Sequence, residues 1–251
     1  MLTTIDKKDT ALLAQAILKK LAVSTGAKDI QKLFPEKAKP LESAIESIIQ
    51  IEDIWEHTSA DNKHTYGRKH KGEIIKLWSV PEKSAQLLEN LIILTDAKAV
   101  VEVGTSAGFA AMYMAHGAKQ NQGTVHTIEL LDIKHNLAAE KIRISGLKNI
   151  NLVHGEAGKV LSSWSGDKID FVFLDADKEN YGKYLDILIP IMNIGGIIVA
   201  DNINDYGHMM EDYLQRVTGT HLPKTRTDHR VRSYYLAALD NGLMITKKIS
   251  D

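Results

Sequence analysis

The sequence contains no cysteine among its 251 residues. This absence excludes disulfide bonds, thiolate metal sites and cysteine nucleophiles. The chain also carries little net charge, formally −1 at pH 7, so no overall field favours nucleic acid or an anionic membrane. No apolar run approaches the ~18 residues that cross a bilayer, and the first residues lack the apolar core of a signal peptide. A reducing, cytoplasmic location is therefore the default expectation.

The amino-terminal part of the chain, residues 1–76, differs in pattern from the rest. Apolar residues at helical spacing predict helices over residues 10–23 and 40–55. Their apolar faces could pair in a homodimer. Residues 56–72 are polar and basic without a period, and we interpret them as a loop.

Strands and helices alternate from residue 77 to residue 251. Strands are predicted over residues 98–104, 123–130, 150–155, 169–176 and 195–201. Helices are predicted over residues 81–97, 109–119, 133–147, 180–192 and 206–219. A hairpin over residues 233–248, with its turn at residues 240–242, would end the chain. The pattern predicts an α/β fold, with a doubly wound, mostly parallel sheet, helices on both faces, a C-terminal antiparallel hairpin and extra N-terminal helices.

Polar residues or glycines follow each of the predicted parallel strands. In strand order they are Glu102, Gly104 and Gly108; then Glu129; then the segment HGEAG at residues 154–158; then Asp175, Asp177 and Lys178; and finally Asp201 and Asn202. In a doubly wound sheet, ligands bind beyond the carboxyl ends of the strands. We therefore expect these groups to converge on one crevice.

The glycines after the first strand favour a nucleoside ligand. Gly104 and Gly108 have the spacing G-x-x-x-G, whereas a dinucleotide site would have G-x-G-x-x-G. Fewer glycines suit a ligand without a pyrophosphate. Glu129 stands 25 residues after Gly104, at the end of the second strand, where an acid can accept hydrogen bonds from ribose hydroxyls. A plain tight turn and a solvated acid are the structural alternatives.

The residues at two of the predicted strand ends offer only oxygen atoms as ligands for a metal ion. Asp175 follows one strand, and Asp201 and Asn202 follow a strand that should be its neighbour. Oxygen ligands without nitrogen or sulfur suit hard cations such as Mg²⁺, Mn²⁺ or Ca²⁺. A helix cap and a turn are the alternative roles. Lys178 could enter the same crevice and act as a base, or it could be a solvated lysine.

These motifs resemble those of a known family. The segments VVEVGTSAGFAAM, HTIEL, FVFLDADKENY and GGIIVADNI, in this order and spacing, resemble the cation-dependent class I O-methyltransferases. That family uses S-adenosylmethionine and includes the catechol and caffeoyl-CoA enzymes. The resemblance covers residues 77–251 and implies a Rossmann-like methyltransferase domain, a divalent cation, and a small hydroxylated acceptor of the catechol or vicinal-diol type. It also implies that residues 1–76 contribute to substrate choice and dimer contacts.

The resemblance implies roles for individual residues. The cofactor-binding residues would be Val80, Glu102, Gly104, Thr105, Ser106, Gly108, Glu129, Glu156, Ala157 and Asp175. Glu129 would hold the ribose, and Glu156 with Ala157 would border the adenine. The metal ligands would be Asp175, Asp201 and Asn202, and the catalytic residues would be Lys178, as the base, and Asp175.

The chain departs from the family pattern at two places. Ala110 stands where members often have a serine that binds the cofactor carboxylate, so this contact must come from backbone or from elsewhere. The tryptophan-containing loop that follows Asp-Asn in many members is also missing. Tyr206 and His208 could replace it or face the solvent.

Two other functions stay open at this point. Some relatives methylate a hydroxyuridine of tRNA, and a basic segment with one aromatic residue could bind phosphates. Its residues are Lys63, His64, Tyr66, Arg68, Lys69, His70 and Lys71. A solvated loop is the simpler interpretation of this segment. The other function is that of a non-catalytic S-adenosylmethionine-binding protein.

Overall fold

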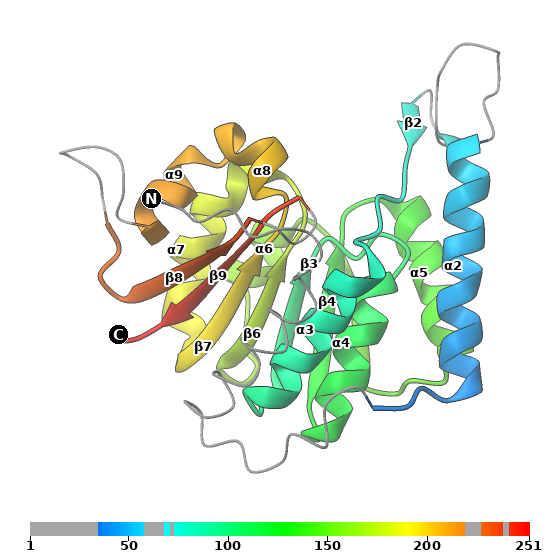
Figure 1. The fold of residues 1–251 in the computed structure, drawn as a ribbon, viewed down its shortest axis with the longest axis horizontal. Coiled ribbons are helices and arrows are strands. Elements are labelled where there is room, and N and C mark those ends of the chain that lie inside the picture. The colour runs from blue at the N-terminus through cyan, green and yellow to red at the C-terminus, as the bar shows by residue number, and fades with distance from the viewer. Residues whose placement is uncertain (1–34, 58–67, 71–72, 219–226, 238–240) are drawn as a thin grey trace.

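The computed structural model describes residues 35–57, 68–70, 73–218, 227–237 and 241–251. Its main feature is a seven-stranded sheet in the order β5-β4-β3-β6-β7-β9-β8 (Figure 1). The parallel strands are β3 (Ala99–Val103), β4 (Thr124–Glu129), β5 (Ile150–His154), β6 (Ile169–Leu174) and β7 (Met192–Ala200). The antiparallel strands at one edge are β8 (Val231–Leu236) and β9 (Leu243–Lys248). The predicted α/β fold with a C-terminal hairpin is confirmed.

Helices cover both faces of this sheet. On the side of one face lie α3 (Glu82–Leu94), α4 (Phe109–Gln120) and α5 (Asp132–Ser145), with α2 (Lys39–His57) packed outside them against α5 and α4. On the side of the other face lie α6 (Ala157–Ser162), α7 (Tyr181–Ile191) and α9 (Glu211–Thr218). The alternation of side chains along each strand divides the core. In β3, Val100 packs with the first group of helices, and Val101 and Val103 pack with the second.

Helix α2 brings the amino-terminal region onto the body of the molecule. The predicted apolar face of residues 40–55 is confirmed at Leu41, Ala44, Ile45 and Ile48, which are buried in the same core as the sheet. The helix lies beside α5 (Figure 1). The predicted helix over residues 10–23 lies outside the described residues, so its pairing in a dimer stays a prediction. In the described parts of the chain, no helix is both long and apolar enough to span a membrane.

Three local predictions need correction. Residues 56–57 continue helix α2, and residues 68–70 form strand β1 (Arg68–His70), which pairs with β2 (Glu73–Ile75). The loop interpretation is therefore wrong for these residues. Their polar side chains show no hydrophobic period, although the backbone is regular. The predicted helix over residues 206–219 breaks into the end of α8 (Ile203–Tyr206), the 3-10 turn η3 (Gly207–Met209) and α9. Helix α6, a short helix of six residues, was not predicted.

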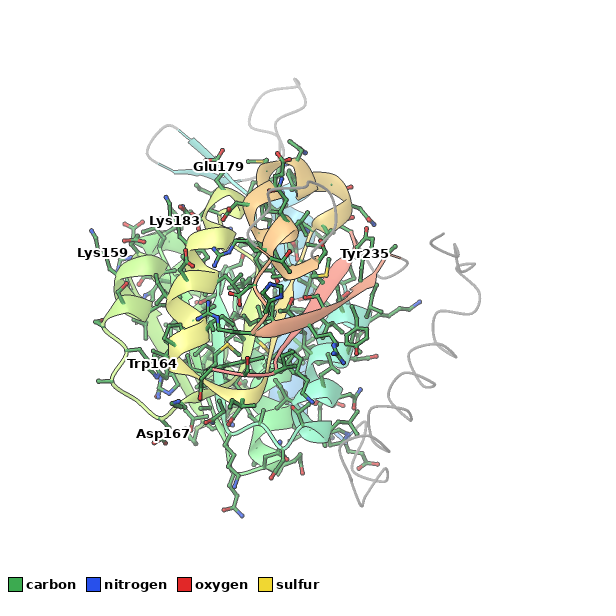
Figure 2. All side chains as sticks on the ribbon, turned by 90° about the vertical axis from the view of Figure 1, so that its left-hand side faces the viewer. Lys159, Trp164, Asp167, Glu179, Lys183 and Tyr235 are labelled. Atoms are coloured by element: carbon green, nitrogen blue, oxygen red, sulfur yellow. The ribbon has the colours of Figure 1, made fainter. Side chains whose placement is uncertain are left out.

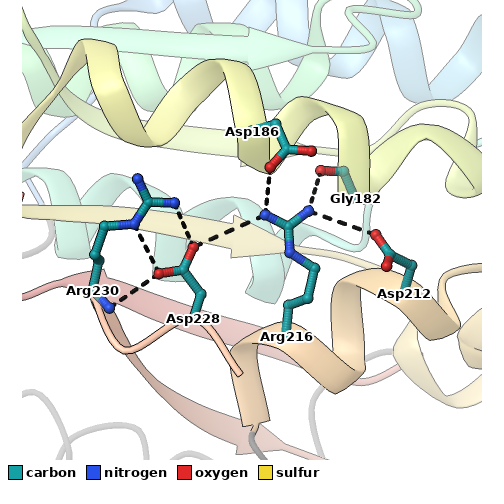
Figure 3. A network of polar contacts seen from close by, with 6 residues as sticks. All are labelled: Gly182, Asp186, Asp212, Arg216, Asp228 and Arg230. Carbon is teal, nitrogen blue, oxygen red and sulfur yellow. Dashed lines mark hydrogen bonds and ion pairs between the residues drawn. The ribbon is translucent and has the colours of Figure 1, made fainter. Parts of the chain in front are cut away.

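A buried arginine joins the helices beside the edge strands (Figure 3). Arg216 of α9 donates to the carbonyl oxygen of Gly182 at 2.9 Å and to Asp186 at 2.5 Å. Its guanidinium also lies 3.9 Å from Asp228, which Arg230 binds at 2.7 Å. A cavity of about 430 Å³ opens beside this network. Because its charges are paired with one another, we interpret the network as a structural clamp between α7, α9 and β8.

Candidate active site

The register of β6 and β7 places two carboxylates side by side. Leu174 and Ala200 are paired in the parallel ladder, and the next residues are Asp175 and Asp201. The amide nitrogen of Asp201 donates to the carbonyl oxygen of Leu174 at 3.1 Å. The two strands are therefore neighbours, as predicted.

The end of β7 also has the geometry of a tight turn. Asp201 is 1% exposed, and its Oδ1 accepts a 2.6 Å hydrogen bond from the amide of Asn202. Asn202 has a φ of 66°, in the left-handed region that asparagine tolerates, and it precedes helix α8. The turn and the proposed site use the same two residues, so neither role excludes the other. Among the described residues, no group of three or more histidine, aspartate or glutamate side chains is arranged to hold a metal ion. The predicted set has two carboxylates and one amide, and it stays a prediction.

Lys178 does enter the crevice beside Asp175. It lies in the 3-10 turn η2 (Lys178–Asn180), and its Nζ donates to Asp175 Oδ1 at 2.7 Å and to the Tyr181 hydroxyl at 3.1 Å. Tyr181 is fully buried and donates to the carbonyl oxygen of Leu174 at 2.8 Å. Burial, followed by the charges of Asp175 and Asp201, raises the pKa of Tyr181 well above its usual value. Tyr181 therefore remains a neutral phenol that holds the lysine amine in place.

The glycine turn after β3 fits closely against the end of β6. Gly104 has a φ of 100°, and a Cβ built on it would lie 2.1 Å from the carbonyl oxygen of Asp175. Gly108 has a φ of 90° and precedes helix α4, and its amide donates to the carbonyl oxygen of Thr105 at 2.8 Å. Both glycines adopt backbone conformations that side chains disfavour. The turn thus holds the Asp175 backbone in contact with the glycine loop.

Glu102, in β3, has one carboxylate oxygen without a hydrogen-bond partner in the described part of the chain. It is fully buried, and Thr127, which also hydrogen-bonds Thr105, donates to its Oε2. Among the described residues, Glu102 Oε1 has no hydrogen-bond partner. Burial, together with the charges of Asp175 and Glu129, raises the pKa of Glu102 well above its usual value, and the Thr127 bond only partly opposes this shift. A buried acceptor without a partner is rare in a native protein and calls for a donor from a ligand.

Glu129 connects two loops at the end of β4. Its Oε2 accepts from the amide of Ser106 at 2.8 Å, and its Oε1 accepts from the amide of Leu131 at 2.8 Å. Each carboxylate oxygen can accept a second hydrogen bond. A ribose hydroxyl can therefore bind here without displacing the backbone contacts, and the predicted ribose role stays a prediction.

Glu156 has a local role that the sequence did not predict. Its Oε1 accepts from the amide of Gly158 at 2.8 Å and so caps the amino terminus of α6. Ala157 is buried behind it. One carboxylate oxygen of Glu156 is thus engaged in the cap, and the predicted position at the adenine is untested.

The segment before α3 covers the glycine turn. The carbonyl oxygen of Leu77 accepts from Ser106 Oγ at 2.5 Å and lies 3.5 Å from the amine of Lys134. The amide of Ser79 donates to Glu52 Oε1 at 2.7 Å. Val80, a predicted cofactor contact, is buried in this segment. The segment of residues 77–80 therefore lies against the glycine turn and α5.

Trp78 is an exposed residue of this segment. It is 68% exposed, and its φ of 52° lies in the left-handed region, which is unfavourable for a bulky side chain. The Lys134 amine lies 5.4 Å from the centre of the ring. Tyr206 and His208, which could replace the missing tryptophan-containing loop over a substrate, are both exposed. Most of the basic segment at residues 63–71 lies outside the described residues, and no side chain of it is described.

Lys134 is a buried residue near the predicted site that sequence reasoning missed. It is 8% exposed, and burial lowers the pKa of its amine, while the charges of Glu129, Asp175 and Glu52 act in the opposite direction. Its burial shows only in the structure, because the buried positions of α5 do not form an apolar pattern. The buried positions of α5 are Lys134, Ala138, Lys141 and Ser145. This helical spacing places Lys134 on the inner face of α5, despite its charge.

A glycine turn, an acid at the end of the second strand and paired carboxylates at the carboxyl edge of the sheet are typical of α/β proteins that bind a nucleoside. Comparison with known proteins narrows this class. Residues 57–249 match the family model described as O-methyltransferase. The chain belongs to this O-methyltransferase family.

Individual relatives support the same family. The chain is 35% identical over 108 residues to a catechol O-methyltransferase of Mycobacterium tuberculosis, a match that covers 43% of this chain and 49% of that protein. It is 29% identical over 189 residues to a caffeoyl-CoA O-methyltransferase of Mesembryanthemum crystallinum, covering 70% of this chain and 74% of that protein. With three of the curated relatives, the match spans only 49% to 58% of their length.

A solved structure confirms the fold. The O-methyltransferase from Bacillus cereus in complex with SAH has a TM-score of 0.65 and 18% identity, with 92% of this chain and 99% of that chain covered. At this identity the likeness concerns the fold alone, which is a Rossmann-like methyltransferase fold.

Proposed function

We propose that this protein transfers the methyl group of S-adenosylmethionine to a hydroxyl oxygen of a small catechol-like or vicinal-diol acceptor, with a divalent cation in the same site. One observation carries the proposal. The paired strands β6 and β7 bring Asp175 and Asp201 together, and Lys178 lies 2.7 Å from Asp175. The site therefore combines oxygen ligands for a cation with an amine that can accept a proton.

The crevice fits the proposed cofactor. S-adenosylmethionine carries an ammonium group on its amino-acid end, and the unpartnered Oε1 of Glu102 can accept a hydrogen bond from it. Gly104 allows the glycine turn to lie directly against the end of β6, where any side chain would collide with the Asp175 backbone. Glu129 offers its remaining lone pairs to the ribose. When bound, the cofactor supplies a methyl group made electrophilic by the sulfonium.

The oxygen set fits a divalent cation. Asp175, Asp201 and Asn202 would hold it, and these ligands leave coordination positions for water and for an acceptor. When bound, the cation lowers the pKa of a hydroxyl that it coordinates.

In its neutral form, with the lone pair of Nζ free, Lys178 takes the proton from the acceptor hydroxyl. Asp175 and the neutral Tyr181 hold its amine at the mouth of the crevice, so the proton leaves toward Lys178 as the acceptor oxygen bonds to the methyl carbon. Alignment of acceptor and cofactor contributes a proximity term of up to about 7–11 kcal/mol in favourable cases.

The test is a methyl-transfer screen with labelled S-adenosylmethionine. The acceptors are catechols, acyl-CoA thioesters and bulk tRNA, each assayed with Mg²⁺ and with EDTA. We expect catechol methylation that requires the metal and is lost in Asp201→Ala. Asp205→Ala is the matched control, because Asp205 is an exposed carboxylate in α8. Full activity in EDTA would overturn the proposal that a metal is required. Methylation of tRNA and of no small molecule would overturn the proposal of a small acceptor.

A further inference from the structure

We infer that Lys134 binds the carboxylate of the cofactor's amino-acid end and so replaces the serine hydroxyl that Ala110 lacks. The inference rests on the proposed function, because it assigns a residue to the ligand of that site. It also gives a reason for the burial of a lysine whose one hydrogen bond among the described residues is long.

The amine of Lys134 is buried with few partners. Lys134 is 8% exposed, and its one hydrogen bond among the described residues goes to the carbonyl oxygen of Leu77 at 3.5 Å, near the limit for such a bond. An ammonium group has three donors. Burial of a charge with unused donors is costly unless a partner arrives.

The carbonyl oxygen of Leu77 has a hydrogen-bond donor other than Lys134. Its carbonyl oxygen already accepts a 2.5 Å hydrogen bond from Ser106 Oγ. Removal of the Lys134 amine would therefore leave no orphaned acceptor at Leu77. Because Lys134 lies beside the glycine turn, we attribute its buried charge to the binding of a ligand and not to the stability of the fold.

The position of Lys134 matches the charge pattern of an amino-acid group. The charges of Glu129 and Asp175 act on this part of the site, which suits an ammonium group and repels a carboxylate. The half-buried amine of Lys178 is already bound to Asp175 and Tyr181. The donors of Lys134 are less fully used, so a carboxylate can approach them.

A second group, in the segment whose Leu77 carbonyl contacts Lys134, also lacks a partner. Among the described residues, the buried Oγ of Ser79 makes no hydrogen bond. Ser79 lies in this segment, two residues after Leu77. The Ser79 hydroxyl and the Lys134 amine are both donors, which is the complement that a carboxylate requires.

The experiment compares three ligands by calorimetry, without any turnover. They are SAH, its decarboxylated analogue that keeps the amine, and 5′-methylthioadenosine, which lacks the whole amino-acid end. In the unmodified protein, SAH should bind about 10–100-fold more tightly than the decarboxylated analogue, as for a charge-assisted hydrogen bond. In Lys134→Met this preference should fall to about twofold or less, with the affinity for 5′-methylthioadenosine unchanged.

The matched control is Lys141→Met. Lys141 is 6% exposed on the same face of α5, two turns further along the helix, and its only ion pair among the described residues is to Glu140 at 4.0 Å. This variant should keep the preference for SAH. Lys134→Arg should restore part of it, and Lys134→Gln repeats the comparison if Lys134→Met does not fold.

The outcomes separate two failures. If a variant that lacks the Lys134 charge prefers SAH as strongly as the unmodified protein does, this inference is overturned and the proposed function is not affected. Binding of neither SAH nor 5′-methylthioadenosine by the unmodified protein overturns the proposed function and the inference with it.

Discussion

Gly104 lies in direct contact with Asp175, so close that a Cβ on Gly104 would come within 2.1 Å of the Asp175 carbonyl oxygen. The contact joins the turn after β3 to the end of β6. It links the proposed cofactor loop to a proposed metal ligand through backbone atoms. The first prediction follows from this contact.

Gly104→Ala should lower stability and abolish SAH binding. The added methyl collides with backbone, and the φ of 100° is unfavourable for alanine, so the cost should exceed the roughly 1–2 kcal/mol of conformational strain alone. Gly195→Ala is the control, because Gly195 has a φ of 93° with no atom within 4 Å of its added Cβ. Urea unfolding of both variants measures the difference. Equal losses of stability would show that the contact with Asp175 is unimportant.

Lys178→Met should reduce kcat while SAH binding stays the same. A positioned base contributes about 10²–10⁴-fold, and Lys178 is bound to Asp175 at 2.7 Å at the proposed acceptor end. The measurement is kcat with the acceptor found in the screen, together with calorimetry for SAH. Lys183→Met is the control, since Lys183 is exposed at the surface (Figure 2) and donates to Asn180 Oδ1 at 2.7 Å. A kcat within about twofold of the unmodified protein would rule out Lys178 as the base.

Glu102→Gln should change the pH dependence of stability. The pKa of Glu102 is raised in the folded state by burial, so between its unfolded and folded pKa values the folded chain holds a proton that the unfolded chain has lost. Stability therefore falls as pH rises through this window, which begins near the unfolded value of about 4.3. The glutamine stays neutral and avoids this loss.

Melting temperatures from pH 4 to pH 8 test this prediction. The difference between Glu102→Gln and the unmodified protein should be small at pH 4 and should increase in favour of the variant as pH rises. Glu179→Gln, at an exposed position, should show no such trend. A constant difference across the range would contradict the shifted titration of Glu102.

Arg216→Met should destabilise the protein by about 1–3 kcal/mol, the range for hydrogen bonds to charged groups. Arg216 is buried and donates to Gly182 and Asp186 (Figure 3). Asp186 is 64% exposed, and solvent screening keeps the loss at the lower end of this range. Arg230→Met, at a more exposed position that contacts Asp228, should cost less than about 1 kcal/mol. Urea unfolding distinguishes them, and equal costs would contradict the clamp.

Much of the fold could be predicted because its signals are local. The apolar runs of β3, β6 and β7 and the helical spacing of α2 and α7 are each contained in about ten to twenty residues. The neighbouring ends of β6 and β7 also followed from the alternation of strands and helices. Helix α6 was missed because six residues are too few to show a period. The helical reading of residues 206–219 was wrong because a 3-10 turn interrupts the backbone there.

The sequence by itself determined the sheet, its carboxyl-edge residues and the family, since strand patterning and motif spacing are properties of short segments. Only the tertiary structure decided which of these residues lack partners. The unused Oε1 of Glu102, the engaged oxygens of Glu129 and the burial of Lys134 depend on contacts between segments far apart in the chain. Hydrogen-bond satisfaction and desolvation arise from packing in three dimensions, and no local pattern records them.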